Sequence, residues 1–131
     1  MNNTVNVSAL NNPPNFENKI AIVTGGGKGL GRACVLGLAS AGAHVIAAAR
    51  TKSDLNEVKS HYPDKIEIWT EDVLEDTLYA RIEKLEHLDI LVGCAGGNKP
   101  EPITEISLDT IDWMLDLNVK SIFRASQSAA K

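Results

Sequence analysis

The sequence predicts an α/β fold built on a doubly wound parallel sheet, and two observations support this. Short, almost wholly apolar runs of strand length alternate with longer stretches in which apolar residues recur at helical spacing. The runs 20–23 and 44–49 are nearly continuous rather than alternating, as expected of strands that are covered on both faces. Strands that alternate with helices form βαβ units, and their right-handed crossovers place helices on both faces of the sheet.

Each element is expected from a local pattern. Strands are expected at 19–24, 44–49, 66–70 and 88–92, and helices at 29–40, 53–60, 75–85 and 107–131. Gly42 and Pro63 follow the first two helices as stop signals. The run 66–70 alternates between apolar and polar residues, which indicates a strand near a sheet edge. The core-facing stripe expected on the first helix is Leu30, Ala33, Cys34, Leu38 and Ala41.

The stretch 107–131 is expected to form one long helix. Ser107 is a suitable N-cap, and the apolar spacing continues through positions 108, 111, 115, 118, 122, 125 and 129. Position 118 interrupts this stripe, because it is Asn118. A buried amide without partners costs roughly 1–3 kcal/mol. Asn118 is therefore either bonded to neighbouring backbone or is a polar group delivered to a site.

Composition limits the classes of function. The chain has 131 residues, 44% of them apolar and 23% charged, and a net charge of −4 without a basic cluster, which argues against a nucleic-acid partner. No apolar run approaches the ~18 residues of a membrane span. No signal peptide is visible, so we expect a cytoplasmic protein without a membrane partner. Residues 1–15, rich in asparagine, are expected to form a flexible leader before a domain at 16–131.

Cysteine and histidine usage gives no metal signal. Cys34 and Cys94 lack CxxC spacing and are interpreted as buried, reduced thiols. The histidines, at positions 44, 61 and 87, have no second histidine at i,i+4 spacing and no clustered carboxylates, so we expect no metal site.

The stretch 20–31 is the most informative, because an apolar strand ends there in glycines that open directly into a helix. Thr24, Gly25, Gly29 and Gly31 give the pattern T-G-x-x-x-G-x-G, and no set of glycines fits G-x-G-x-x-G. A P-loop is excluded because Lys28 is followed by glycine rather than Ser or Thr. A helix N-terminus presents free N–H groups and a positive dipole end, which suit the pyrophosphate of a dinucleotide. A glycine turn without a ligand is the alternative.

Four motifs in this order resemble the short-chain dehydrogenase/reductase family. Besides the glycine turn, they are Asp72-Val73 after the third strand, where the family has its adenine-pocket pair, the run 93–96 (Gly-Cys-Ala-Gly), where it has Asn-Asn-Ala-Gly, and Asn118, which matches the asparagine of its catalytic set. The resemblance runs from about residue 16 to residue 131 and covers the first half of a typical member. It implies a Rossmann-like dinucleotide-binding domain, here incomplete, with strand order 3-2-1-4. It also implies hydride transfer between a nicotinamide cofactor and a small carbonyl or alcohol substrate.

Each motif has a physical interpretation. Gly25 permits the turn, and Gly29 and Gly31 let backbone approach phosphate and let helix pack on strand. Asp72 can accept from the adenine amine or cap a turn, and Val73 can line the base or belong to the core. Ala95 and Gly96 leave room for a flat ring or ribose. The cofactor-binding residues expected in total are Thr24, Gly25, Lys28, Gly29, Leu30, Gly31, Arg50, Asp72, Val73, Gly93, Ala95 and Gly96.

Charge favours NADP(H) over NAD(H). An NAD enzyme places Asp or Glu about 20 residues after the glycines to bond the ribose 2′-hydroxyl. The corresponding strand end is Ala49, with Arg50 next to it and Lys28 inside the glycine turn. Two cations without an acid favour a 2′-phosphate. The alternative is that both cations are ordinary solvated charges.

The family's Tyr-x-x-x-Lys pair does not occur in the 131 residues, since position 66 follows Tyr62 by four and position 83 follows Tyr79 by four, and neither is lysine. We therefore expect the chain alone to lack turnover, and a nucleotide-binding module without chemistry is the alternative function. The fourth strand would form an open edge and the 107–131 helix would keep an uncovered apolar side, so we expect a homo-oligomer through that helix.

Overall fold

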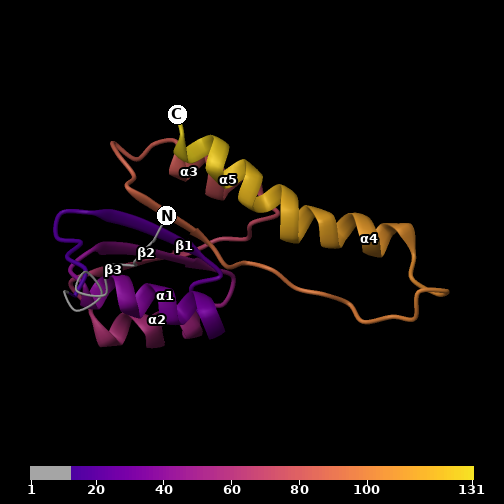
Figure 1. Ribbon diagram of the computed structural model, residues 1–131, viewed down its shortest axis with the longest axis horizontal. Coiled ribbons are helices and arrows are strands. Elements are labelled where there is room, and N and C mark those ends of the chain that lie inside the picture. The colour runs from indigo at the N-terminus through magenta and orange to yellow at the C-terminus, as the bar shows by residue number, and fades with distance from the viewer. Residues whose placement is uncertain (1–12) are drawn as a thin grey trace, which may run out of the picture.

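The structure, a computed structural model, describes residues 13–131 and contains one parallel four-stranded sheet (Figure 1). The strands are β1 (Ile20–Thr24), β2 (His44–Ala49), β3 (Ile66–Thr70) and β4 (Ile90–Gly93). Their order is β3-β2-β1-β4, and in the register Ile22 of β1 lies between Ile46 and Leu91. The predicted fold class, the strand order and the edge position of β3 are confirmed.

Two pairs of helices cover the two faces of the sheet. Figure 1 shows α1 (Gly29–Ser40) and α2 (Lys52–His61) on one face, with α3 (Asp76–Ile82) and α5 (Ser121–Ala129) on the other. Successive side chains of a strand point to opposite faces, so β1 supplies both sides. Val23 packs with Val35 and Leu55 under α1 and α2, whereas Ile22 packs with Leu78 under α3. The core is therefore two apolar layers separated by the sheet.

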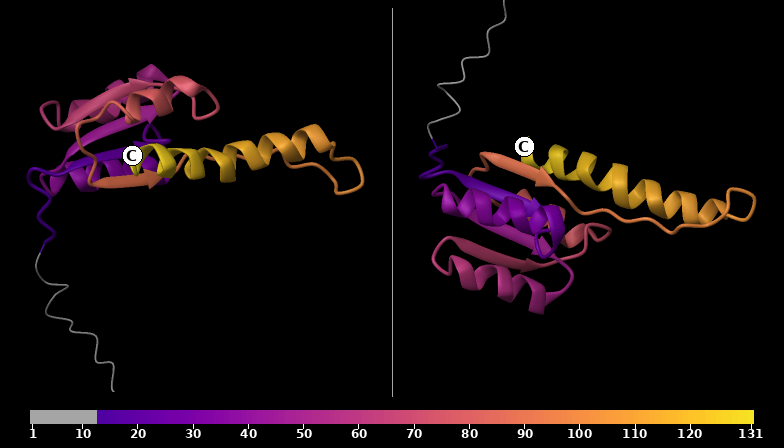
Figure 2. Two further views of the ribbon diagram at one scale, coloured as in Figure 1. Left: turned by 90° about the horizontal axis from the view of Figure 1, so that it is seen from above. Right: turned by 60° about the horizontal axis from the view of Figure 1, so that its bottom comes forward.

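The long C-terminal helix runs without a gap from Leu108 to Ala129, but it is not α-helical throughout. It comprises α4 (Leu108–Leu115), a π-helical turn η2 (Asp116–Lys120) and α5. Its α4 end projects beyond the sheet together with the loop before it (Figure 2). The prediction of one unbroken stripe over 107–131 is wrong, because the side chains of Leu108 and Leu115 are 80% and 46% exposed. A π turn inserts an extra residue, which shifts the faces on either side of it, and α4 has no sheet beneath it.

The stripe expected on the first helix is also partly wrong. The buried residues of α1 are Gly31, Val35 and Ala39, while Leu30 is 69% exposed. The helix comes closest to the glycine turn and to Cys94 at Gly31, which has no side chain, whereas the neighbouring Leu30 faces solvent.

Several boundaries differ from expectation by one residue, and two elements differ by more. The third helix ends at Ile82 instead of 85, and the fourth strand is Ile90–Gly93 instead of 88–92. Residues 1–12 lie outside the described part of the chain, so the leader stays a prediction. Residue 16 is already anchored, since the Phe16 N–H donates to the Ala41 carbonyl at 2.8 Å. Within 13–131, no helix is both long and apolar enough to cross a membrane.

Candidate cofactor-binding site

A cavity of about 360 Å³ opens where β1, β2 and β4 end. In a doubly wound sheet, ligands bind in the crevice outside the carboxyl ends of the strands. Eight of the predicted cofactor residues line this cavity: Gly25, Lys28, Gly29, Arg50, Asp72, Val73, Ala95 and Gly96. Residues that the sequence analysis did not propose also line it: Gly27, Ala48, Ala49, Thr51, Asp54, Glu71, Cys94 and Leu117.

The glycines of the turn are fixed by conformation and by close approach. Gly25 and Gly29 have φ values of 68° and 53°, in the left-handed region where an L side chain is strained. A Cβ on Gly25 would lie 2.7 Å from the Ala95 nitrogen, and one on Gly31 would lie 2.1 Å from the Gly25 carbonyl oxygen. A Cβ on Gly29 would meet nothing within 4 Å. Gly25 and Gly31 therefore pack the turn against β4, and Gly29 faces open space.

The N-terminus of α1 faces the cavity with its backbone donors uncapped. The residue before the helix, Lys28, is extended (φ −144°, ψ 163°), and its side chain makes no capping hydrogen bond. No acidic side chain lies in the first turn of α1. The first N–H groups of a helix need a partner, and an anion is a suitable one. This end of α1 therefore has backbone donors that could bind a negatively charged group.

The corner of the cavity after β2 contains an acid that the sequence analysis missed. Arg50 and Lys28 line it as predicted, but the Lys28 Nζ lies 3.3 Å from an oxygen of Asp54. Asp54 is in the first turn of α2, four residues beyond the cation Arg50. Its proximity to Lys28 joins two elements 26 positions apart, which spacing alone does not reveal. The premise of two cations without an acid is wrong at this corner.

Comparison with known proteins decides the family. The family described as short chain dehydrogenase matches residues 19–131. The chain belongs to this family. A similar curated protein is the L-xylulose reductase of Mesocricetus auratus, 32% identical over 111 residues that cover 85% of this chain and 46% of the relative. The chain spans about half the length of the curated relatives it matches.

Solved structures of short-chain dehydrogenases share the fold. One from Serratia marcescens has a TM-score of 0.81 and 34% identity, and covers 91% of this chain and 51% of its own. Another, from Bacillus anthracis, has a TM-score of 0.78 and 28% identity, and covers 86% of this chain and 49% of its own.

Four predicted cofactor residues do not line the cavity: Thr24, Leu30, Gly31 and Gly93. The Thr24 hydroxyl oxygen accepts from the Ala95 N–H at 3.4 Å, and the Thr24 carbonyl accepts from the Cys94 N–H at 3.0 Å. A Cβ on Gly93 would lie 2.2 Å from Cδ1 of Ile122. Where the short-chain dehydrogenase pattern has asparagine, this chain therefore has a glycine that makes room for α5.

The two free cysteines are half-buried rather than buried as predicted, and Cys94 lines the cavity. Burial raises the pKa of the Cys94 thiol, and the adjacent Cys34 thiol raises it further. A thiol is nucleophilic as the thiolate, so this environment does not activate Cys94. Within residues 13–131 no group of histidine, cysteine and carboxylate side chains could hold a metal ion.

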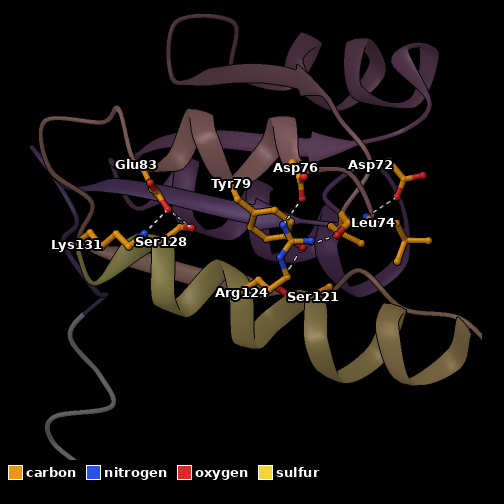
Figure 3. Close-up of polar contacts among 10 residues, drawn as sticks. Asp72, Leu74, Asp76, Tyr79, Glu83, Ser121, Arg124, Ser128 and Lys131 are labelled. Atoms are coloured by element: carbon orange, nitrogen blue, oxygen red, sulfur yellow. Dashed lines mark hydrogen bonds and ion pairs between the residues drawn. The ribbon is translucent and has the colours of Figure 1, made fainter. Parts of the chain in front are cut away.

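Asp72 and Val73 are held by hydrogen bonds on the far side of the cavity. An Asp72 carboxylate oxygen accepts from the Leu74 N–H at 2.9 Å, so the turn-capping interpretation of Asp72 describes one of its contacts. Val73 is 9% exposed and belongs to the core under α3, yet it also lines the cavity. Figure 3 shows the Tyr79 ring beside Arg124 and Leu74 next to Asp72, and the Tyr79 hydroxyl donates to the Val73 carbonyl.

The same close-up shows what holds α5 against this loop. Arg124 stacks 3.9 Å from the centre of the Tyr79 ring and donates to Asp76 at 2.5 Å (Figure 3). Burial raises the pKa of the Tyr79 phenol. Hydrogen bonding from Arg81 and then from Thr77 lowers the pKa of Glu71, which lines the cavity as a carboxylate. The Asp72–Val73 loop is thus fixed from both α3 and α5.

Asn118 is not buried, contrary to expectation. It lies in the π turn and both ends of its amide are bonded. Its oxygen accepts from the Gly97 N–H at 3.0 Å, and its nitrogen donates to the carbonyls of Gly97 and Met114, each at 2.8 Å. The interpretation as an asparagine bonded to backbone therefore describes all three contacts. These contacts tie the loop after β4 to the helix, next to Gly96 in the cavity wall.

Proposed function

We propose that these residues bind a nicotinamide dinucleotide as the cofactor half of a short-chain oxidoreductase. The observation that carries the proposal is the uncapped N-terminus of α1, wrapped by a glycine turn and opening into a cavity of about 360 Å³. In the proposal, the pyrophosphate lies at Gly29, Leu30 and Gly31, and the adenine lies against Val73 with Asp72 as an acceptor. Ala95 and Gly96 leave space for the remaining ribose and the nicotinamide.

The proposed reaction is hydride transfer between this cofactor and a small carbonyl or alcohol compound. The cofactor supplies the hydride chemistry, and the protein binds and orients it. Asn118 is proposed as a member of the catalytic set, because its side chain forms hydrogen bonds to the Gly97 backbone after β4. Proton transfer is assigned to neither tyrosine, because Tyr62 does not line the cavity and Tyr79 is 5% exposed and bonded to backbone. We expect the 131 residues alone to show no turnover.

NADP(H) is proposed over NAD(H) because Arg50 lies at the end of β2, where the ribose 2′ position is recognised. Replacing Arg50 with Met is expected to weaken NADPH binding about tenfold and to change NADH binding less than twofold, since a charge-assisted contact to phosphate contributes roughly 1.5–3 kcal/mol. Fluorescence titration with both cofactors measures this. Lys59→Met, which removes a cation from α2 outside the cavity, is the control. Equal loss of both cofactors in R50M would contradict the assignment.

We further propose that two copies of this chain associate through the outer face of the long helix. Leu115, Val119 and Phe123 are 46%, 55% and 63% exposed there, an apolar strip that water solvates poorly. Sedimentation velocity is expected to show a dimer or larger species, shifted to monomer by V119K/F123E. The control is Ile103→Lys, which changes an 88% exposed apolar side chain off the helix. A monomeric parent chain would contradict the proposal.

A further inference from the structure

The ion pair between Lys28 and Asp54 lies inside the cavity wall. The Lys28 Nζ is 3.3 Å from Oδ2 of Asp54, and both residues line the cavity beside Arg50 and Thr51. Their side chains differ in exposure, with Lys28 78% and Asp54 25% exposed. A cation on the rim is therefore paired with a carboxylate that is set further in.

Asp54 is the fixed member of this pair. It belongs to the first turn of α2, where a carboxylate is favoured by the helix dipole. Its Cβ packs on the glycine turn, since a Cβ on Gly27 would lie 3.1 Å away from it. The Lys28 stem is long and mostly solvated, so the ammonium can leave Asp54 for another anion, whereas the shorter Asp54 side chain is 25% exposed and has less freedom to move.

Unlike Lys28, Arg50 is not paired with a carboxylate in the described part of the chain. Among residues 13–131, Arg50 takes part in none of the ion pairs. A 2′-phosphate in this corner is therefore attracted by the unpaired guanidinium of Arg50. The Lys28 ammonium is already paired with Asp54, and the Asp54 carboxylate repels the phosphate because both are negative. A 2′-hydroxyl carries no charge and does not meet this opposition.

We propose that Asp54 is a specificity-determining residue that limits the preference of this site for NADP(H). It holds Lys28 and places a negative charge beside the position of the 2′-phosphate, so the site binds NADP(H) less tightly than its two cations alone would allow. This inference rests on the proposed cofactor site.

The test is titration of NADPH and NADH into the chain and its variants, with folding of each checked by circular dichroism. Asp54→Asn is expected to tighten NADPH binding about fivefold, the factor that corresponds to ~1 kcal/mol for a released exposed pair, and to change NADH binding less than twofold. Asp54→Ser repeats the test with a shorter side chain. Asp64→Asn, which removes the same charge from an exposed turn outside the cavity, is expected to change neither affinity.

The double variant K28M/D54N separates the two effects of the carboxylate. If Asp54 acts mainly by holding Lys28, most of the gain in NADPH affinity seen in D54N is lost in K28M/D54N. If Asp54 acts by repelling the phosphate, the gain persists in the double variant. Either result supports the inference. An unchanged ratio of the two affinities in D54N, weaker NADPH binding, or a loss confined to NADH would overturn it. A folded parent chain that binds neither cofactor would instead overturn the proposed function.

Discussion

Gly31→Ala is expected to lower the free energy of unfolding by about 2–3 kcal/mol and to weaken cofactor binding more than tenfold. The added Cβ would lie 2.1 Å from the Gly25 carbonyl oxygen and 2.7 Å from the Gly25 carbonyl carbon. Both contacts are with backbone, which cannot move aside like the end of a flexible side chain. Relief requires the glycine turn and the N-terminus of α1 to separate, which displaces the proposed phosphate-binding amides. Denaturant unfolding and NADPH titration measure the two effects.

The matched control is Gly37→Ala in the same helix. A Cβ there would meet nothing within 4 Å, and the position is exposed. Alanine in an exposed helix interior is favoured over glycine by roughly 0.5–1 kcal/mol, so this variant is expected to be slightly more stable than the parent. Equal behaviour of the two variants would show that the close approach at Gly31 does not constrain the turn.

Leu55→Ala is expected to lower the free energy of unfolding by roughly 2–5 kcal/mol. Leu55 is fully buried, in the apolar layer that α1 and α2 share with β1 and β2. It also lies under the glycine turn, with Cδ2 3.9 Å from the position of a Cβ on Gly27. Truncation leaves a cavity directly beneath the candidate site, and urea unfolding measures the loss.

The control for this change is Leu108→Ala, because Leu108 is 80% exposed at the start of α4. Its truncation is expected to change the free energy of unfolding by less than about 0.5 kcal/mol. A similar cost for both leucines would contradict the assignment of the core to the layer under α1 and α2.

The sheet was predictable because its signals are local. Strands buried on both faces are continuous apolar runs, and the bounds of β2 and β3 agree with expectation at both ends. The N-cap Ser107 could also be predicted from the sequence, and its hydroxyl oxygen accepts from the Thr110 N–H at 3.1 Å. Periodicity failed where a helix departs from 3.6 residues per turn. The π turn around Asn118 breaks the stripe without a glycine or proline to announce it.

The candidate site also has a part that could be predicted from the sequence and a part that could not. Its glycine turn could be predicted because the strand, the glycines and the helix are adjacent in sequence. Asp54 could not, because its meeting with Lys28 depends on how α2 packs beside the turn. The role of Gly93 was also hidden, since the side chain that fills its place, Ile122, is 29 positions further along the chain. Contacts between distant elements are set by packing, and one sequence does not display them.

The most direct test of the central claim is an NMR titration of the ¹⁵N-labelled chain with NADPH. If the N-terminus of α1 receives the pyrophosphate, the largest amide shifts will fall on Gly29, Leu30 and Gly31, with smaller shifts at Val73 and Ala95. The amide resonances of β3 and of the outer face of α5 will not shift. A folded sample whose α1 amides do not respond to millimolar NADPH or NADH, or whose shifts lie wholly outside the cavity, would contradict the account.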